Sequence, residues 1–577
     1  MSDDRYDPDA DGVDQGKRLV RIGGDRGLSL ADRVAERLQR LTWRTPLHSM
    51  RLRGRYPLKL IAVADDPFMG DVERGHALLD GTMMFRGEER AITALDFARP
   101  DFSRAFADHV HSFAWLRDLS TVTTRAGGAP IAEMIMAKWL AVHGEKVSDT
   151  AWRADLWGRR ILFWIAHAPL ILSSPDLIYR SSVLHAIARG ARHLDRAADR
   201  VQIGTPRIAA WCGVLVAGLM IPGGDPRRAA SEAGLNRALT ASVFSDGGTV
   251  GRSPAGLLES IQLLAMLCEC YDARRLEPPA FVETTMAKMV TALLGVCHGD
   301  DGLASWQGSA PIAGDVVQQA IEATGIRTRP LKQARDWGYQ RLSAQGTVLI
   351  MDAAPPPLAR LIEGGCASTL AFELSDGPHR IVVNCGGSSM ADGRLPRQLT
   401  EALRSTAAHS TLTIGDSNST AIHADGTLGR GVGEVELSRQ ESETASRIEA
   451  SHDGYVRRFG FIHRRAISLG PDGKDVRGED MLLPADHRRQ KGGTGFAIRF
   501  HLAPGIEIAP TADGLGAFLR LPSGAVWQFR ARGGLLAVEE SMWIDGQGRP
   551  VATEQLVVTA DTPPGGTNVT WVFHRAR

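Results

Sequence analysis

The chain changes character at Trp337-Gly338-Tyr339, and a strand-like run, Thr347-Val348-Leu349-Ile350-Met351, follows closely. Before this point, apolar residues recur every three or four positions, as in the segments 131–143, 152–167 and 254–271. After it, short alternating runs are separated by turn residues. The first pattern is typical of amphipathic helices and the second of β-strands. The sequence therefore predicts a helical part followed by a part built from strands.

Three regions follow from these patterns. Residues 1–28 are polar and rich in Asp and Gly, so we expect a flexible tail. Residues 29–336 carry the helical pattern, and short connectors between helices favour antiparallel pairs, closed into an incomplete α/α toroid or arranged as an open bundle. Residues 337–577 hold many strands in series, which favours an antiparallel β-sandwich. Pro206 and Pro254 stand where helices are expected to begin.

The composition excludes some classes of partner. A formal net charge of +1 gives no general attraction to nucleic acid, although an acidic polymer would still need a local basic groove. No apolar run is long enough for a membrane-spanning helix. The acidic start Met1–Asp7 lacks the basic and apolar regions of a secretory signal, which favours a cytoplasmic protein or an unusual export route.

The chain has six cysteines, and most of them lie inside apolar runs, as Cys212 does. Cys268-Glu269-Cys270 together with Cys297-His298 could be taken for a zinc cluster. A single residue between two cysteines is not one of the usual zinc spacings, however. The pattern therefore favours buried free thiols.

Several motifs occur in an order that resembles the heparinase II/III family. The most specific is Arg404-Ser405-Thr406-Ala407-Ala408-His409-Ser410-Thr411-Leu412, followed by Asn418-Ser419. His452-Asp453-Gly454-Tyr455 and the strand 499–504 come later in the chain. In the helical half, a loop runs from Asp246-Gly247-Gly248 to Arg252-Ser253-Pro254. Together these similarities cover most of residues 100–575.

The resemblance implies an α+β multidomain fold in which an α/α toroid packs on an antiparallel β-sandwich, with the substrate in the cleft between them. It also implies cleavage of an acidic, uronate-containing polysaccharide, such as a glycosaminoglycan, by β-elimination in the bacterial cell envelope. No cofactor is required for this reaction. Some relatives hold a divalent metal in the sandwich, but the spacing of His463 and His501 does not identify ligands here.

β-Elimination needs a group that neutralises the uronate carboxylate, a base and an acid. His409 falls at the family's histidine and is the predicted base or electrostatic clamp; the alternative is a buried histidine bonded to the backbone. Arg252 is predicted to bind the carboxylate, or else to form an ion pair with Asp246. Tyr455 is a candidate acid, although a structural tyrosine with a bonded hydroxyl is the alternative.

Five further residues are predicted to bind substrate. Arg207 could reach the cleft from the start of its helix, and Trp115 could stack on a sugar. His452 lies three positions before Tyr455, so on a regular strand the two would face opposite sides. The full set of predicted binding residues is Arg207, Trp115, Asp246, Asn418 and His452.

The sequence departs from the family pattern at two places. Thr205 and Pro206 stand where the resemblance expects Asn and His, and Gly256 and Leu257 stand where it expects Tyr and His. None of these four side chains can act as an acid at neutral pH or clamp a carboxylate with charge. A glycan-binding or cell-envelope protein that keeps the fold without catalysis is therefore the alternative. A glycoside hydrolase using Asp246 and Glu259 is a third hypothesis.

Overall fold

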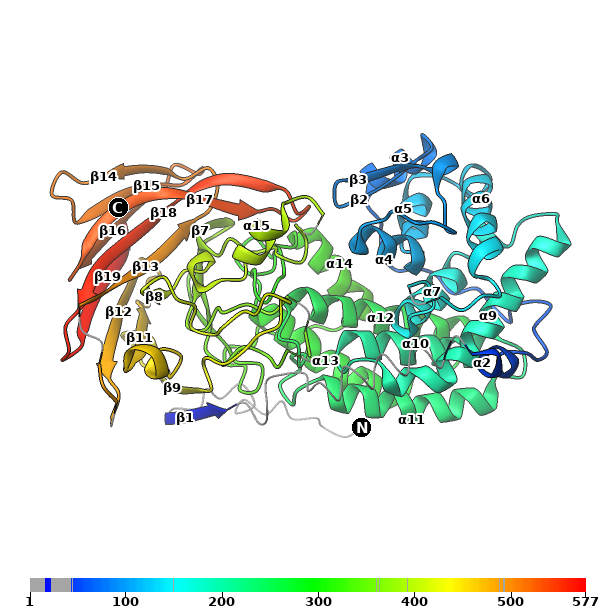
Figure 1. Cartoon of the computed structure of the whole chain (residues 1–577), viewed down its shortest axis with the longest axis horizontal. Coiled ribbons are helices and arrows are strands. Elements are labelled where there is room, and N and C mark those ends of the chain that lie inside the picture. The colour runs from blue at the N-terminus through cyan, green and yellow to red at the C-terminus, as the bar shows by residue number, and fades with distance from the viewer. Residues whose placement is uncertain are drawn as a thin grey trace.

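The computed structural model describes residues 16–21, 43, 45–148, 150–359, 361–362, 364–391, 393–486, 488–490 and 493–576. The chain forms an N-terminal helical part and a C-terminal part of two large β-sheets, lying side by side (Figure 1). The predicted fold class, an α/α toroid followed by an antiparallel β-sandwich, is confirmed. Among the described residues, no helix has the length and apolar character needed to cross a membrane.

The helical part begins with short elements and continues with longer helices. Its described α-helices are α2 (Pro46–Arg51), α3 (Val72–Leu79), α4 (Arg104–Ser112), α5 (Trp115–Val122), α6 (Arg125–His143), α7 (Ala154–Ala166), α8 (Ala168–Ile171), α9 (Leu177–Ala197), α10 (Thr205–Met220), α11 (Asp225–Ser242), α12 (Pro254–Ala273), α13 (Ala280–Gly295) and α14 (Gly314–Thr324). A hairpin of β2 (Thr82–Phe85) and β3 (Glu88–Ala91) interrupts the series. The sequence did not predict this hairpin.

Helix α10 lies at the centre of the helical part, packed against α7, α9, α11 and α12. Every residue from Ile208 to Met220 is buried. The crossing of α7 and α10 depends on Gly158, because a Cβ atom there would lie 2.0 Å from the carbonyl oxygen of Ala209. Glycine is therefore required for the two backbones to approach this closely.

The C-terminal part consists of two antiparallel sheets. The nine-stranded sheet has the order β1 (Gly16–Arg21), β9 (Glu434–Glu441), β10 (Ser446–His452), β11 (Phe461–Leu469), β12 (Asp475–Pro484), β19 (Thr567–Arg575), β16 (Val526–Arg532), β15 (Gly516–Arg520) and β14 (Glu507–Pro510). The eight-stranded sheet has the order β17 (Leu535–Ile544), β18 (Pro550–Thr562), β13 (Thr494–Leu502), β7 (His379–Val383), β6 (Phe372–Asp376), β5 (Thr347–Asp352) and β4 (Tyr339–Ala344), with β8 (Leu412–Ile414) paired to β13.

The core of the sandwich is aromatic. The ring of Phe372 stacks on Trp571, with centroids 5.3 Å apart, and Phe500 and Phe573 pack around them. Large aromatic side chains bury much apolar surface and prefer offset or edge contacts, so they fix how the two sheets pack.

The structure differs from the sequence prediction at the N-terminus. Residues 16–21 form strand β1, which pairs antiparallel with β9, where we expected a flexible tail. Arg18 also contacts Asp336 at 3.3 Å, which ties the strand to the domain junction. The rest of the predicted tail lies outside the described residues.

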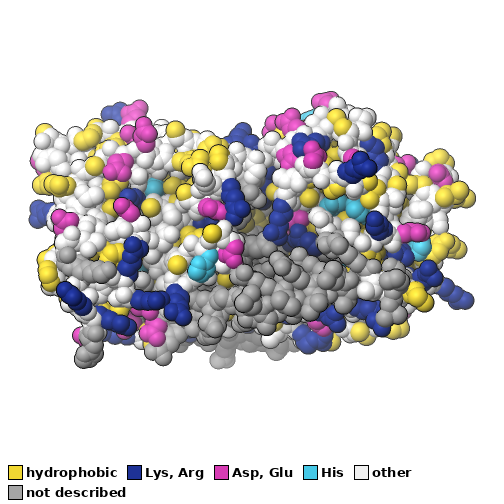
Figure 2. Space-filling view, viewed as in Figure 1, with side chains coloured by type: hydrophobic (Ala, Val, Ile, Leu, Met, Phe, Trp, Pro, Cys, Tyr) yellow, Lys and Arg dark blue, Asp and Glu magenta, His cyan; other side chains and the backbone are white. Residues whose placement is uncertain are grey.

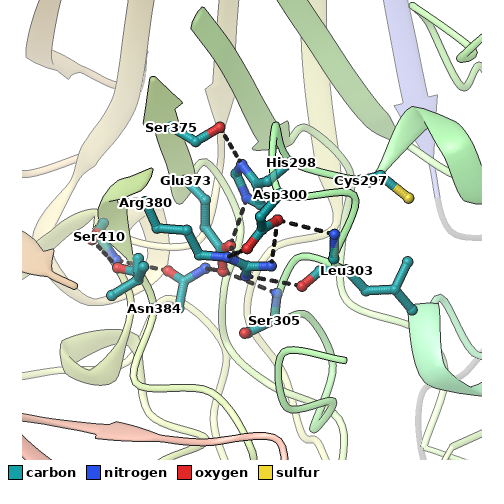
Figure 3. Close-up of polar contacts among 12 residues, drawn as sticks. Cys297, His298, Asp300, Leu303, Ser305, Glu373, Ser375, Arg380, Asn384 and Ser410 are labelled. Carbon is teal, nitrogen blue, oxygen red and sulfur yellow. Dashed lines mark hydrogen bonds and ion pairs between the residues drawn. The ribbon is translucent and has the colours of Figure 1, made fainter. Parts of the chain in front are cut away.

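A buried polar cluster joins the loop after α13 to the sheet domain (Figure 3). His298 lies between Ser375 Oγ, at 3.0 Å from its Nδ1, and Glu373 Oε2, at 2.9 Å from its Nε2. The other oxygen of Glu373 accepts hydrogen bonds from Ser305 N and from Asn384 Nδ2. Because a buried charge that loses its partner is costly, this cluster resists separation of the loop after α13 from the sheet domain.

The candidate binding cleft between the domains

A cleft of about 920 Å³ lies between the helical part and the sheet domain. In the space-filling view, Lys and Arg side chains gather along the hollow between the two lobes (Figure 2). Four helices direct their N-terminal ends into the cleft, namely α4, α7, α10 and α12, through lining residues at or next to their first turns. Helix N-termini carry unpaired N–H groups and the positive end of the helix dipole. The backbone alone therefore makes this cleft favourable for anions.

The charged side chains of the cleft lining increase this preference. Six arginines and three carboxylates line it: Arg86, Arg104, Arg153, Arg200, Arg397 and Arg404, with Asp108, Asp155 and Glu401. Arginine presents a planar fork of donors that suits carboxylate, sulfate and phosphate groups. The excess of guanidinium groups gives the cleft a local positive charge that the overall charge of the chain does not reveal.

The carboxylates of the lining are already paired. Arg153 donates to both oxygens of Asp108, at 2.7 and 2.9 Å, and to Asp155 at 2.7 Å. Burial works to raise the pKa of Asp155, but Arg153 and Arg159 hold it below its ordinary value. Glu401 accepts from Arg397 at 2.7 Å. These ion pairs keep the carboxylates occupied.

Two other lining arginines differ in how firmly they are held. Arg404 is buried and donates twice to the carbonyl of Gly365. Arg200 is exposed, and its side chain has no hydrogen-bond or ion-pair partner among the described residues. Arg200 is therefore available to a ligand without first breaking a contact.

The lining lacks the groups that usually perform acid–base chemistry near neutral pH. Among the described residues that line the cleft there is no histidine, tyrosine, lysine or asparagine. General acids and bases work best with a pKa near the operating pH. The cleft therefore offers cations and hydroxyl groups, while its carboxylates are held in ion pairs.

The positions that depart from the family pattern lie at this cleft. Thr205, Pro206 and Gly256 are part of the lining. The Thr205 hydroxyl lies 2.8 Å from the carbonyl of Gly256 and 2.9 Å from Ser260 Oγ, which ties α10 to α12. Leu257 is fully buried in the core of the helical part. Glu259, named above in the glycoside hydrolase hypothesis, pairs with Arg159 at 2.6 Å.

His409 does not line the cleft. Its ring is 1% exposed, and its Nδ1 lies 2.7 Å from the carbonyl of Ser405, a geometry in which the ring N–H donates. Burial lowers the pKa of His409 below its ordinary value. These contacts match the alternative stated for this residue, a buried histidine bonded to the backbone. Its catalytic role stays a prediction.

Arg252 is buried at the domain junction. It donates from Nη2 to Asp352 at 2.5 Å, from Nε to the Trp337 carbonyl and from Nη1 to the Pro355 carbonyl. Burial works to lower the pKa of Arg252, but Asp352 and its other partners raise it above the ordinary value. The sequence suggested Asp246 as the ion-pair partner, and the structure shows Asp352 in that position instead.

Tyr455 and His452 lie inside the sandwich. The Tyr455 hydroxyl donates to the carbonyl of Leu412 at 2.7 Å, and burial raises the pKa of this hydroxyl far above its ordinary value. His452 Nε2 lies 3.2 Å from His463 Nδ1, and His463 Nε2 faces Asp480 at 2.7 Å. Tyr455 follows the strand and begins a short helix, α16 (Val456–Phe459), as its N-cap. Both predicted residues therefore have structural partners away from the cleft lining.

The remaining predicted binding residues also hold structure together. Arg207 donates to the carbonyl of Val201 from two nitrogens, and the Trp115 ring is fully buried beside Phe113. Asp246 accepts from the backbone N–H groups of Asp336 and Trp337, each at 2.8 Å.

Asn418 accepts from the backbone N–H of Thr406 at 2.9 Å. Like the others, it is not among the residues that line the cleft. The structure therefore does not bring the predicted site residues together around one opening, and their substrate contacts stay predictions.

Sequence reasoning placed Thr205, Pro206 and Gly256 at the site but missed the charged and aromatic residues that line the cleft. Arg404 begins the motif that contains His409, but no role was predicted for it. The other five arginines lie outside the motifs and are hard to single out among the 67 Lys and Arg residues of the chain. Trp43 was missed too, although it is the only aromatic residue in the described lining. The available signal was the placement of Arg104, Arg153 and Arg200 within a few residues of a helix start.

Comparisons with known proteins agree with the architecture. Residues 326–572 match the family model described as heparinase II/III-like, C-terminal. The whole chain is 27% identical over 563 residues to the FtsZ-localized protein C of Caulobacter vibrioides, with 92% of each chain covered.

Two solved structures illustrate the likeness of fold. A crystal structure of heparinase III has a TM-score of 0.68 at 13% identity, covering 92% of this chain and 89% of the other. The heparan sulfate lyase HepC from Pedobacter heparinus has a TM-score of 0.57 at 14% identity, covering 92% and 87%. At such identities the likeness concerns the fold and not the activity.

Proposed function

We propose that this chain, whose residues 326–572 match the heparinase II/III-like C-terminal family model, binds an acidic polysaccharide in its interdomain cleft without cleaving it. The observation that carries this proposal is the composition of the cleft lining. It combines six arginines and four helix N-termini with no histidine or tyrosine among the described lining residues.

The charge of the cleft favours a ligand with repeated negative groups. Fixed cations in a concave site concentrate the electric field and attract anions over a distance. Uronate-containing glycans carry one carboxylate on every acidic sugar, so successive groups can meet successive arginines. The cleft volume of about 920 Å³ accommodates several sugar rings rather than one.

The lack of a histidine or tyrosine among the described lining residues argues against β-elimination in this cleft. Elimination requires proton removal from carbon and proton donation to the leaving oxygen. Thr205, Pro206 and Gly256 supply neither, and the carboxylates of the lining are paired with arginines. His409 and Tyr455 are buried, and each is bonded to a backbone carbonyl.

Binding and turnover can be measured on the same sample. The purified protein is titrated with acidic and neutral oligosaccharides by calorimetry, and the ultraviolet absorbance of an unsaturated uronate product is followed in parallel. We expect saturable binding of acidic glycans and no new absorbance. Arg477→Ala, an exposed arginine on β12 outside the cleft lining, is the matched control for Arg200→Ala. An unsaturated product that disappears in His409→Ala would overturn the proposal in favour of an active lyase.

A second candidate function comes from the full-length relative. That protein is named for its localisation with FtsZ, and its similarity spans 92% of both chains, whereas the lyases share 13–14% identity with this one. We propose that this protein also localises with FtsZ. A fluorescent fusion expressed in Caulobacter vibrioides in place of the relative should coincide with labelled FtsZ; a uniform distribution would contradict this.

A further inference from the structure

Trp43 is the only aromatic side chain in the described lining of the cleft, and it is half-buried. Its ring meets His193 edge to face, with centroids 5.0 Å apart and an interplanar angle of 81°. Because Trp43 both contacts His193 and lines the cleft, part of its indole ring stays accessible to a ligand.

The imidazole ring of His193, which contacts Trp43, has hydrogen-bond partners at both nitrogens. His193 is fully buried, and its Nε2 lies 2.9 Å from the carbonyl of Trp152. Its Nδ1 lies 3.2 Å from His48 Nε2. Burial lowers the pKa of His193 to about 3, so the ring is neutral at physiological pH. A neutral His193 that donates from Nε2 accepts at Nδ1, which orients His48 as donor. Trp43 therefore packs against an imidazole ring whose orientation is fixed by hydrogen bonds.

Arg200 lies on the same helical segment as His193. Helix α9 (Leu177–Ala197) continues directly into a short 3-10 turn, η3 (Ala198–Arg200). Arg200 ends this turn, and it lines the same cleft as Trp43. The Arg200 side chain is exposed and without a partner among the described residues. The described lining of the cleft thus includes an aromatic ring and an uncommitted guanidinium.

We propose that Trp43 and Arg200 form a subsite for one acidic sugar residue. The indole of Trp43 packs against the C–H face of the pyranose ring, and the guanidinium of Arg200 pairs with the carboxylate. This inference rests on the proposed glycan binding and deepens it, because it requires a ligand with an apolar ring face as well as negative charge. A polymer that carries charge alone would engage Arg200 and leave Trp43 unused.

The test compares ligands of similar charge and different ring chemistry. Hyaluronan oligosaccharides and inorganic polyphosphate are titrated into the full chain and into Trp43→Ala, Trp43→Phe, Arg200→Ala and the control Arg477→Ala. We expect Trp43→Ala to weaken hyaluronan binding about tenfold, Trp43→Phe to retain most of it, and neither to change polyphosphate binding. Arg200→Ala should weaken both ligands several-fold.

Each other outcome is decisive. Equal affinity of wild type and Trp43→Ala for hyaluronan, or an equal loss for polyphosphate, would overturn the subsite while leaving glycan binding intact. No hyaluronan binding by the wild type would overturn the proposed function and the subsite with it. Tighter, Trp43-dependent binding of a single-stranded oligonucleotide would assign the stacking face to a base instead. Thermal unfolding of each variant confirms that it is folded, and Trp43→Phe keeps an aromatic ring at this position.

Discussion

Arg252 of the helical part donates from Nη2 to Oδ1 of Asp352 in the sheet domain at 2.5 Å, and both side chains are almost completely buried. This ion pair lies at the junction between the domains, where Arg252 also holds two backbone carbonyls. The backbone of Arg252 has a φ of +55°, an unusual conformation for a residue other than glycine. The fold therefore accommodates this junction arginine at some cost in backbone conformation.

Replacing Arg252 with alanine should destabilise the protein by about 3–5 kcal/mol, because Asp352 would remain as a buried, uncompensated charge. Chemical denaturation monitored by circular dichroism measures this loss. Exposed Arg477→Ala should change stability by less than about 0.5 kcal/mol. A folded Arg252→Ala variant of normal stability that has lost ligand binding would instead support the role predicted from the sequence.

Replacing His409 with alanine should lower stability by about 1–3 kcal/mol, because the Ser405 carbonyl would lose its donor in a buried place. Glycan affinity should stay within twofold of wild type, since His409 does not line the cleft. His76→Ala is the control, because it removes an exposed histidine instead of a buried one. A large fall in affinity without a fall in stability would show that His409 reaches the ligand.

Glycan binding should weaken as salt is raised, because the cleft attracts its ligand through partly exposed charges. Arg200→Ala should reduce both the affinity and the salt dependence, with a loss of about 1 kcal/mol. Calorimetric titrations at several salt concentrations measure both quantities. Affinity that does not change with salt would contradict a cationic cleft.

Stability should fall as the pH is lowered below about 6.5. Burial lowers the pKa of His193 and of His501 to about 3, so the unfolded chain binds protons at these two residues that the folded chain does not. The two neutral histidines therefore contribute to the free energy of unfolding at neutral pH. This contribution is lost as the pH falls from the pKa of histidine in the unfolded chain, about 6.5, toward 3. The loss is at most about 1.4 kcal/mol per pH unit for each residue.

Denaturation curves between pH 7 and pH 4 measure this effect. His501→Gln should show a shallower dependence on pH than wild type. If the two curves have the same slope, His501 does not stay neutral in the folded protein.

Gly158→Ala should destabilise the protein by about 1–3 kcal/mol, although alanine normally stabilises a helix more than glycine does. The added Cβ would lie 2.0 Å from the carbonyl oxygen of Ala209, so α7 and α10 would have to separate. Gly256→Ala is the contrasting control, because its nearest neighbour would be Thr205 Oγ1 at 3.3 Å. Thermal unfolding of both variants should show a clear loss only for Gly158→Ala.

The sequence predicted the architecture well because the spacing of apolar residues indicates which face of a helix or strand is buried. The predicted helix start at Pro254 is confirmed, and Ser253 caps it by accepting from the backbone N–H of Gly256. The sheet domain begins at Tyr339, where the pattern changes. Strand β1 was missed because three of its six residues are charged, which hides the alternation of apolar and polar residues, and because its pairing partner is distant in sequence.

The site was harder to predict for a physical reason. The motif around His409 is distinctive, yet in the structure its members bond to each other and to the backbone, as Asn418 does to Thr406. A distinctive motif can reflect packing as well as chemistry. The cleft, in contrast, is made by arginines from separate elements, such as Arg104 and Arg397, whose proximity appears only once the chain has folded.

Strand β1 also has a consequence for how the protein is made. It is synthesised before every other described element, and its partner β9 follows about 400 residues later. At ordinary translation rates this interval is on the order of tens of seconds, during which the helical part can fold. Strand β1 therefore cannot pair with β9 until that strand has been made, and it closes one edge of the nine-stranded sheet as a late step of assembly.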